Sequence, residues 1–251
     1  WPVLHAQSEW RSRMERDPVR FLDGELERQL DLVRGRLGDF LGADEADLAF
    51  VPNATTGVNT VLRSLDFQPT DEILTTDHDY NACLNAIRET ADTTGATAVI
   101  ARVPFPPESD DEVVDAILTR AGTRTRLAVI SHVTSPTALI VPIHRIVSAL
   151  AERGIDTLVD GAHAGYEPTS LNKVGAAYYT GNAHKWLCAP KGSGFLHVRR
   201  DRQGRIRPLI TSHGANIARA DRPRFLLEFD WTGTDDPTPW LTVPKSIERV
   251  F

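Results

Sequence analysis

Apolar residues follow two different spacings along this chain, and each spacing predicts its own kind of element. Between residues 8 and 36 they recur at three- and four-residue steps, with arginine and glutamate on the other face, which predicts helix broken at Pro18. Further along, compact apolar runs predict strands over residues 47–51, 72–75, 96–103, 126–133, 156–159, 176–180 and 194–198. Helical patterns lie between them over residues 58–65, 82–91, 110–120 and 142–153.

The alternation of strands with helices determines the predicted fold class. The strands are apolar at nearly every position instead of every second one, which is typical of a sheet covered on both faces. Alternating strands and helices also favour parallel connections. We therefore expect an α/β protein with a mainly parallel, seven-stranded sheet and helices on both faces. Ligands of such sheets bind beyond the carboxyl ends of the strands.

Polar side chains follow closely after several of these strands. They are Thr55, Tyr80, Ser135, Asp160 and Lys185. Because the carboxyl ends of parallel strands meet at one edge of a sheet, we expect these side chains to surround a single binding site.

Lys185 lies in the loop Asn182-Ala-His-Lys-Trp-Leu-Cys-Ala-Pro-Lys-Gly-Ser-Gly194, between two apolar runs. A loop lysine is ordinarily a solvated charge. Here a histidine, a tryptophan and closely packed small residues can remove water from the amine, which favours the neutral, nucleophilic form that Schiff-base chemistry needs.

Asp160 ends the preceding strand, and His163 follows it by one turn. By themselves these residues can equally be a turn aspartate and a core histidine. Together with Lys185, however, Asp160 completes the pair that pyridoxal 5′-phosphate requires: a lysine for its aldehyde and an acid for its pyridinium nitrogen. The sequence therefore predicts this cofactor.

A possible anion site precedes the helical pattern at residues 58–65. The turn Pro52-Asn-Ala-Thr-Thr-Gly57 connects a strand to a helix N-terminus, where free backbone N–H groups and the helix dipole attract a phosphate. Ala54, Thr55 and Thr56 are the candidate residues for it. The alternative is that Asn53 only caps the helix.

An aromatic side chain beyond the next strand can stack on a planar cofactor. His78 and Tyr80 compete for this position in Asp77-His-Asp-Tyr-Asn81. The alternative is a capping turn with Asp77 or Asp79 at the helix N-cap.

Composition removes several other classes of function. A net charge of −6 and the lack of a basic stripe argue against nucleic-acid binding, and no apolar run reaches membrane-spanning length. Two cysteines cannot form a disulfide scaffold, so we expect a reducing, cytoplasmic setting. The eight histidines are scattered and form no metal motif. A hydrolase or a nucleotide-binding protein is disfavoured, because neither GxSxG nor a dinucleotide glycine fingerprint is present.

The Lys185 loop, together with Arg13-Met-Glu-Arg-Asp-Pro18 and Trp231-Thr-Gly-Thr-Asp-Asp-Pro237, resembles the class V aminotransferase superfamily of fold-type I pyridoxal-phosphate enzymes. Within it, the isopenicillin N epimerase-like branch is the most similar. The resemblance implies a helical segment at residues 1–40 and a cofactor-binding large domain at 41–240. Residues 241–251 would begin a helix leading to a smaller C-terminal domain that is absent from this sequence.

The resemblance also implies a role for each candidate residue. Lys185 would form the aldimine and move protons at the substrate α-carbon, and Asp160 would keep the pyridine nitrogen protonated. His163 would lie near the phenolic oxygen of the ring, with help from Ser135 or Thr134. Tyr80 would stack on the ring, with His78 as the alternative. The phosphate would be held by Ala54, Thr55, Thr56, Asn182 and His184.

Such enzymes are homodimers with the site at the subunit interface, so Gly233 and Thr234 are expected to reach the partner's phosphate. The implied activity is α-proton abstraction from an amino acid, followed by epimerisation or by C–S lyase or desulfurase-type cleavage. Class V transamination, or a truncated non-catalytic dimerisation module, is the alternative. Cys188 is expected to be buried packing and not a persulfide carrier, and His132 and His144 are expected to be structural.

Overall fold

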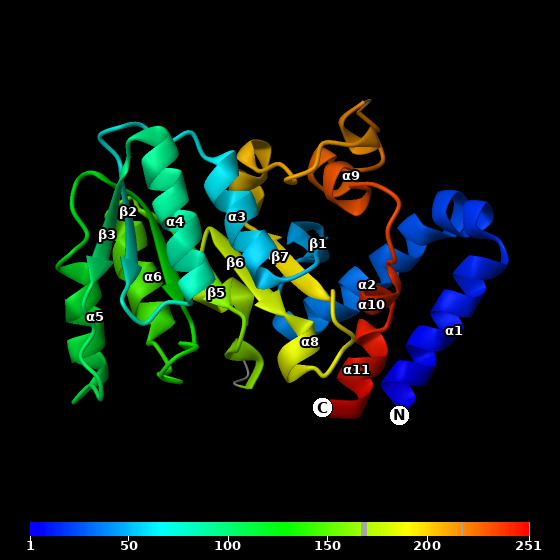
Figure 1. Ribbon diagram of the computed structural model, residues 1–251, viewed down its shortest axis with the longest axis horizontal. Helices are drawn as coiled ribbons and strands as arrows, with labels where there is room; N and C mark the ends of the chain where they lie inside the picture. Colours follow the sequence, from blue (N-terminus) through cyan, green and yellow to red (C-terminus); the bar gives the residue numbers. More distant parts are fainter. Residues whose placement is uncertain (167–169, 217, 251) are drawn as a thin grey trace.

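A computed structural model describes residues 1–166, 170–216 and 218–250, and its centre is a seven-stranded sheet in the order β1-β7-β6-β5-β4-β2-β3 (Figure 1). The strands are β1 (Leu48–Val51), β2 (Glu72–Thr76), β3 (Thr97–Ala101), β4 (Thr125–Ser131), β5 (Asp156–Gly161), β6 (Tyr178–Asn182) and β7 (Gly194–Val198). The α-helices are α1 (Pro2–Arg16), α2 (Leu26–Leu41), α3 (Ala54–Ser64), α4 (Asn81–Thr94), α5 (Asp110–Leu118), α6 (Ile143–Glu152), α7 (Leu171–Val174), α8 (Ala183–Trp186), α9 (Arg224–Asp230), α10 (Thr238–Leu241) and α11 (Val243–Val250).

The sheet is mainly parallel, as the sequence predicts, and β7 is the exception. The pairings β3–β2, β2–β4, β4–β5 and β5–β6 are parallel, whereas β7 runs antiparallel to both β6 and β1. A parallel connection needs a crossover that packs on a face of the sheet. The segment between β6 and β7 contains only the four-residue helix α8 and a loop, so the chain returns beside β6 in the opposite direction.

Helices cover both faces of the sheet, which explains why its strands are apolar at consecutive positions. In β4, Leu127 and Val129 pack into one core cluster with α3, α4 and α9. Ala128 and Ile130 point the other way, into a second cluster with α2, α5 and α6. Because side chains alternate along a strand, a sheet buried on both sides needs apolar residues at every position.

The N-terminal helices pack against the last helices of the chain. The predicted break at Pro18 is confirmed, since α1 ends at Arg16 and a π-helical turn, Arg20–Glu25, leads into α2. Figure 1 shows α1 and α11 side by side. No helix in the described part of the chain is both long and apolar enough to cross a membrane.

Candidate active site

A cavity of about 180 Å³ lies at the carboxyl ends of the parallel strands. Most of the side chains predicted for the cofactor site line it, and every one of them comes from a segment that leaves the sheet at this edge. They are Ala54, Thr55, Tyr80, Ser135, Asp160, His163, Asn182, His184 and Lys185. The structure therefore brings together residues that are up to 131 positions apart in the sequence, from Ala54 to Lys185.

Lys185 lies on α8, and its Nζ is 2.9 Å from Nε2 of His163. Burial lowers the pKa of the Lys185 amine, and the negative charge of Asp160 only partly opposes this. Burial also lowers the pKa of His163, and the neighbouring lysine lowers it further. Both shifts disfavour the state in which the amine and the imidazole are protonated together.

Asp160 lies near the end of β5 and is buried, with only 4% of its surface exposed. Its Oδ1 accepts a hydrogen bond from the backbone N–H of Ala162 at 3.0 Å, and its Oδ2 accepts one from the thiol of Cys83 at 3.2 Å. Burial raises the pKa of the carboxyl group, while both hydrogen bonds act in the opposite direction. No ion pair to Asp160 is formed within the described residues, so a cation bound in the cavity would offset the burial of this charge.

Asp79 is a second buried carboxylate near the cavity, and its hydrogen bonds connect two strands of the sheet. Its Oδ2 accepts from the Thr75 hydroxyl and from the Thr76 backbone, at 2.8 and 2.7 Å, while its Oδ1 accepts from the Ser131 N–H at 2.7 Å. Asp79 therefore joins the end of β2 to the end of β4. The capping interpretation of this turn is wrong, because Tyr80 is the N-cap of α4 and the helix has no side-chain cap.

The structure separates the two aromatic candidates. Tyr80 lines the cavity and is 45% exposed. His78 points elsewhere: its Nδ1 lies 2.9 Å from the Thr137 hydroxyl, and its Nε2 lies 2.9 Å from the backbone oxygen of Val103. His78 is therefore not among the residues that the fold brings to the cavity.

The candidate phosphate turn differs from the prediction because α3 begins at Ala54, earlier than the predicted start at residue 58. Asn53 is its N-cap, accepting from the Thr56 backbone at 2.9 Å and from the Thr56 hydroxyl at 3.1 Å. Thr56 therefore faces Asn53 and does not line the cavity, whereas Thr55 does. The capping and anion-site interpretations are compatible, since the capped helix still presents its N-terminus to the cavity.

Two further residues shape this end of the cavity. The side-chain oxygen of Asn182 accepts from the backbone N–H of Ala54 at 2.8 Å, which holds β6 against the start of α3. Nδ1 of His184 is buried, and none of the described residues forms a hydrogen bond with it. A buried polar atom without a partner beside a helix N-terminus suits a bound anion, which would supply the missing hydrogen bond.

Some predicted residues lie away from the cavity. Gly233 and Thr234 are exposed on the segment that follows α9, so a role toward a partner subunit stays a prediction. The expectation that Cys188 is buried is wrong, because its side chain is exposed. The chain reverses after α8, and Cys188 adopts a left-handed φ of 52° in that reversal, which leaves the side chain in solvent.

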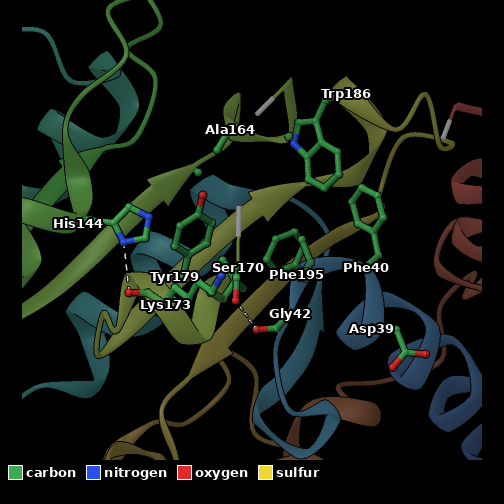
Figure 2. A pocket seen from close by; sticks show the side chains of 14 residues that line it. Asp39, Phe40, Gly42, His144, Ala164, Ser170, Lys173, Tyr179, Trp186 and Phe195 are labelled. Carbon is green, nitrogen blue, oxygen red and sulfur yellow. Dashed lines mark hydrogen bonds between the residues drawn. The ribbon is translucent and has the colours of Figure 1, made fainter. Parts of the chain in front are cut away.

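A larger cavity of about 460 Å³ lies behind α8 and carries none of the predicted chemistry (Figure 2). Phe40, Tyr179, Trp186 and Phe195 form its aromatic walls, and Figure 2 shows these rings around the opening. Phe40 stacks on Trp186 with ring centroids 5.9 Å apart. Cavity size alone therefore does not single out the cavity that carries the candidate chemistry.

Cys83 and Asp79 support the candidate site through contacts that the sequence analysis does not predict. Cys83 is separated from Asp160 by 77 positions, and Asp79 from Ser131 by 52. Neither contact leaves a spacing signal in the sequence, because both depend on how β2, β4 and β5 are ordered in the sheet.

Two curated proteins are similar to this chain in sequence. An isopenicillin N epimerase from Amycolatopsis lactamdurans is 38% identical, over 95% of this chain and 63% of that protein. A putative L-cysteine desulfhydrase from Oryza sativa subsp. japonica is 30% identical, over 99% of this chain and 54% of that protein. The chain thus spans less than two thirds of either relative.

Among solved structures, the cystine C–S lyase C-DES in complex with its product, cysteine persulfide, has a TM-score of 0.89 at 22% identity, over 98% of this chain and 68% of that chain. The likeness confirms the predicted fold of fold-type I enzymes, a mixed seven-stranded sheet with helices on both faces. The family described as aminotransferase class V matches residues 4–222. The chain therefore belongs to the class V aminotransferase family.

Proposed function

We propose that this protein is a pyridoxal-phosphate enzyme that removes the α-proton of a small amino-acid substrate, with epimerisation or C–S cleavage as the outcome. The observation that carries the proposal is the pairing of two groups in one cavity. Lys185 is an amine whose pKa is lowered, and Asp160 is a buried carboxylate without an ionic partner in the described chain. The names of the two relatives support both outcomes.

The residues present fit this cofactor. Asp160 would hold its ring nitrogen, since a cationic N–H offsets the burial of the carboxylate. Tyr80 is the aromatic side chain available to the ring, and His163 the neighbour for its phenolic oxygen. The α3 N-terminus, through Thr55, and the unpartnered Nδ1 of His184 would hold the phosphate. When bound, the cofactor supplies an electron-withdrawing ring that stabilises negative charge at the substrate α-carbon.

Residues of this chain would then transfer the protons of the reaction. The neutral amine of Lys185 is the base for the α-proton, because its lowered pKa increases the unprotonated fraction near neutral pH. His163, 2.9 Å away, accepts a hydrogen bond from Lys185 Nζ and so keeps the amine oriented when it carries a proton. Asp160, in its ionised form, would accept a hydrogen bond from the ring nitrogen and so favour the protonated ring.

The environments of the two cysteines indicate whether a protein thiol could take part in C–S cleavage. Burial and the nearby charge of Asp160 raise the pKa of Cys83, so its thiol stays protonated and is a poor nucleophile. Cys188 is exposed and does not line the cavity. Neither of these thiols suits a desulfurase route through a protein persulfide. Epimerisation is our first candidate because the epimerase is the more similar of the two relatives, at 38% against 30% identity, and desulfhydrase-type C–S cleavage is the second.

We also propose that the protein works as a homodimer in the cytoplasm. The supporting observation for the dimer is that the Gly233–Thr234 turn, expected to serve a partner's site, is exposed and away from the cavity of its own chain. The molar mass in solution, measured by light scattering with and without cofactor, tests this part. A monomer at all concentrations would contradict it.

The experiment that tests the function begins with cofactor binding. The protein is mixed with pyridoxal phosphate, reduced with borohydride and digested, and the modified lysine is located by mass spectrometry. We expect modification at Lys185, loss of the visible absorbance band in Lys185→Ala, and an unchanged band in Lys245→Ala, which alters an exposed lysine on α11.

Amino acids are then incubated with the loaded protein in deuterated water. Chiral analysis of a deuterated α-carbon identifies epimerisation, sulfide with a keto acid identifies C–S cleavage, and a keto acid without sulfide identifies transamination. Binding without any exchange at the α-carbon would leave a non-catalytic module and contradict the enzymatic proposal.

A further inference from the structure

Cys83 is the side chain that contacts the functional carboxylate from outside the cavity. It lies in the first turn of α4 and is only 1% exposed. Its Sγ is 3.2 Å from Oδ2 of Asp160. Cys83 does not line the cavity, so it is placed to act through Asp160 and not on a bound molecule.

The contact is a hydrogen bond donated by the thiol. Burial, together with the negative charges of Asp160 and Asp79, raises the pKa of Cys83, which keeps the proton on sulfur. The other carboxylate oxygen of Asp160 is held by the backbone N–H of Ala162. With one donor on each oxygen, the rotation of the carboxylate is fixed, while Asp160 still faces the cavity with its remaining acceptor positions.

We propose that Cys83 is a positioning residue for Asp160: its thiol hydrogen bond keeps this carboxylate ionised and oriented toward the cationic ring nitrogen of a bound cofactor. The inference rests on the proposed cofactor. It assigns the ionisation and orientation of Asp160 in part to Cys83, a residue on a neighbouring helix. A thiol is a weak donor, so it stabilises the anion without neutralising the charge that the ring nitrogen needs.

Other charged and titratable groups also face Asp160, and none of them can replace Cys83. They are Asp79 beyond β2, Tyr179 on β6, Lys185 on α8, and His163 in the turn after β5. Asp79 disfavours ionisation of Asp160 and Lys185 favours it, in both cases through charge alone. Cys83 is thus the side-chain donor to Asp160 among the described residues, and the Ala162 donor is backbone.

The test uses the full-length protein and compares Cys83→Val, which replaces the thiol by a slightly larger apolar side chain and so removes the donor, with Cys83→Ser, which keeps a donor. Cys188→Ser changes the exposed thiol and is the control. Affinity for pyridoxal phosphate is measured across acidic and neutral pH by fluorescence titration. Protonation of Asp160 weakens cofactor binding, so affinity falls on the acid side with the pKa of this carboxyl group.

In Cys83→Val we expect the acid limb of the affinity profile to move up by about half a pH unit or more, as the loss of one hydrogen bond to a carboxylate implies. The limb should stay near its parental position, or below it, in Cys83→Ser, and should not move in Cys188→Ser. A structural effect of the valine would lower affinity equally at every pH. An acid limb that coincides in parent and Cys83→Val overturns the inference while leaving the cofactor proposal intact.

A second readout needs no cofactor. The infrared S–H stretching band of Cys83, isolated as the difference between parent and Cys83→Val, lies at lower frequency when the thiol donates to a carboxylate. We expect this band to rise in Asp160→Asn, and a band that does not respond would overturn the hydrogen bond itself. A parent protein that binds no pyridoxal phosphate at any pH overturns the proposed function, and with it the cofactor role of Cys83.

Discussion

Nζ of Lys185 lies 2.9 Å from Nε2 of His163, so the amine proposed for catalysis is in direct contact with a second base. The two residues reach each other from different strands, since α8 follows β6 and the turn of His163 follows β5. Burial lowers the pKa of both groups. A pair of this kind cannot carry two protons at neutral pH without repulsion, which favours a reactive amine over a solvated ammonium.

The first prediction concerns the reactivity of that amine without cofactor. Because the pKa of Lys185 is lowered, its neutral form is present at pH values where an ordinary lysine is protonated, and it is lost only as the pH falls through the lowered pKa. We expect an amine-acylating reagent to label Lys185 at lower pH than lysines outside the cavity, with Lys245 as the comparison, as measured by mass spectrometry of peptides. Labelling of both lysines with the same pH dependence would contradict this.

The second prediction concerns the cost to folding stability of burying the Asp160 carboxylate. Its pKa is raised in the folded protein, so folding binds a proton that the unfolded chain releases, and stability falls as pH rises above the unfolded value of 3.8. Asp160→Asn should therefore stabilise the cofactor-free protein at neutral pH by about 1 kcal/mol or more. The gain should disappear below the pKa of the unfolded carboxyl group. Urea unfolding across pH measures both effects.

Asp156→Asn is the matched control for that experiment. Asp156 lies on the same strand but is paired with Arg202, with Nε to Oδ2 at 2.7 Å. Its replacement removes an ion pair and should destabilise the protein by less than about 1 kcal/mol. If both asparagine variants destabilise the protein equally at neutral pH, burial is not the dominant effect at Asp160.

The third prediction tests how closely β7 approaches the candidate phosphate turn. A Cβ on Gly194 would lie 2.7 Å from Cα of Asn53 and 2.9 Å from its backbone N, so it would displace the N-cap of α3. Gly194→Ala should destabilise the protein by about 1–3 kcal/mol and weaken cofactor binding as well. Gly204→Ala is the control, since its Cβ would meet nothing within 4 Å. Equal unfolding midpoints for the two variants would show that the turn can move freely.

Much of this architecture could be predicted from the sequence because burial on both faces leaves a strong pattern. The strand at residues 194–198 is confirmed at both ends. Its direction could not be predicted, since the hydrophobic pattern is the same for parallel and antiparallel pairing. The predicted start of α3 at residue 58 is too late for a related reason. The apolar periodicity becomes visible at Val58, whereas the helix begins after the cap Asn53, whose partner Thr56 is polar.

In the candidate site, too, some residues can be predicted from local sequence and others depend on tertiary structure. Lys185 and Asp160 could be proposed because each lies at a strand end in a distinctive local sequence. His78 and Tyr80 are two residues apart, and only the direction of the turn held by Asp79 separates them. The Cys83–Asp160 contact crosses from α4 to β5, so it depends on tertiary structure and no local pattern predicts it.

The last prediction separates two adjacent threonines that the sequence could not distinguish. Thr55 lines the cavity at the start of α3, whereas the hydroxyl of Thr56 donates to Asn53 at 3.1 Å. If Thr55 binds the cofactor phosphate, Thr55→Ala should reduce the affinity for pyridoxal phosphate by about 10-fold, the effect of one charge-assisted hydrogen bond. Its affinity for pyridoxal, which lacks the phosphate, should not change. Thr56→Ala should instead lower the unfolding midpoint slightly and leave both affinities in place. Equal losses for the two ligands in Thr55→Ala would place the phosphate elsewhere and leave the α3 N-terminus with a structural role.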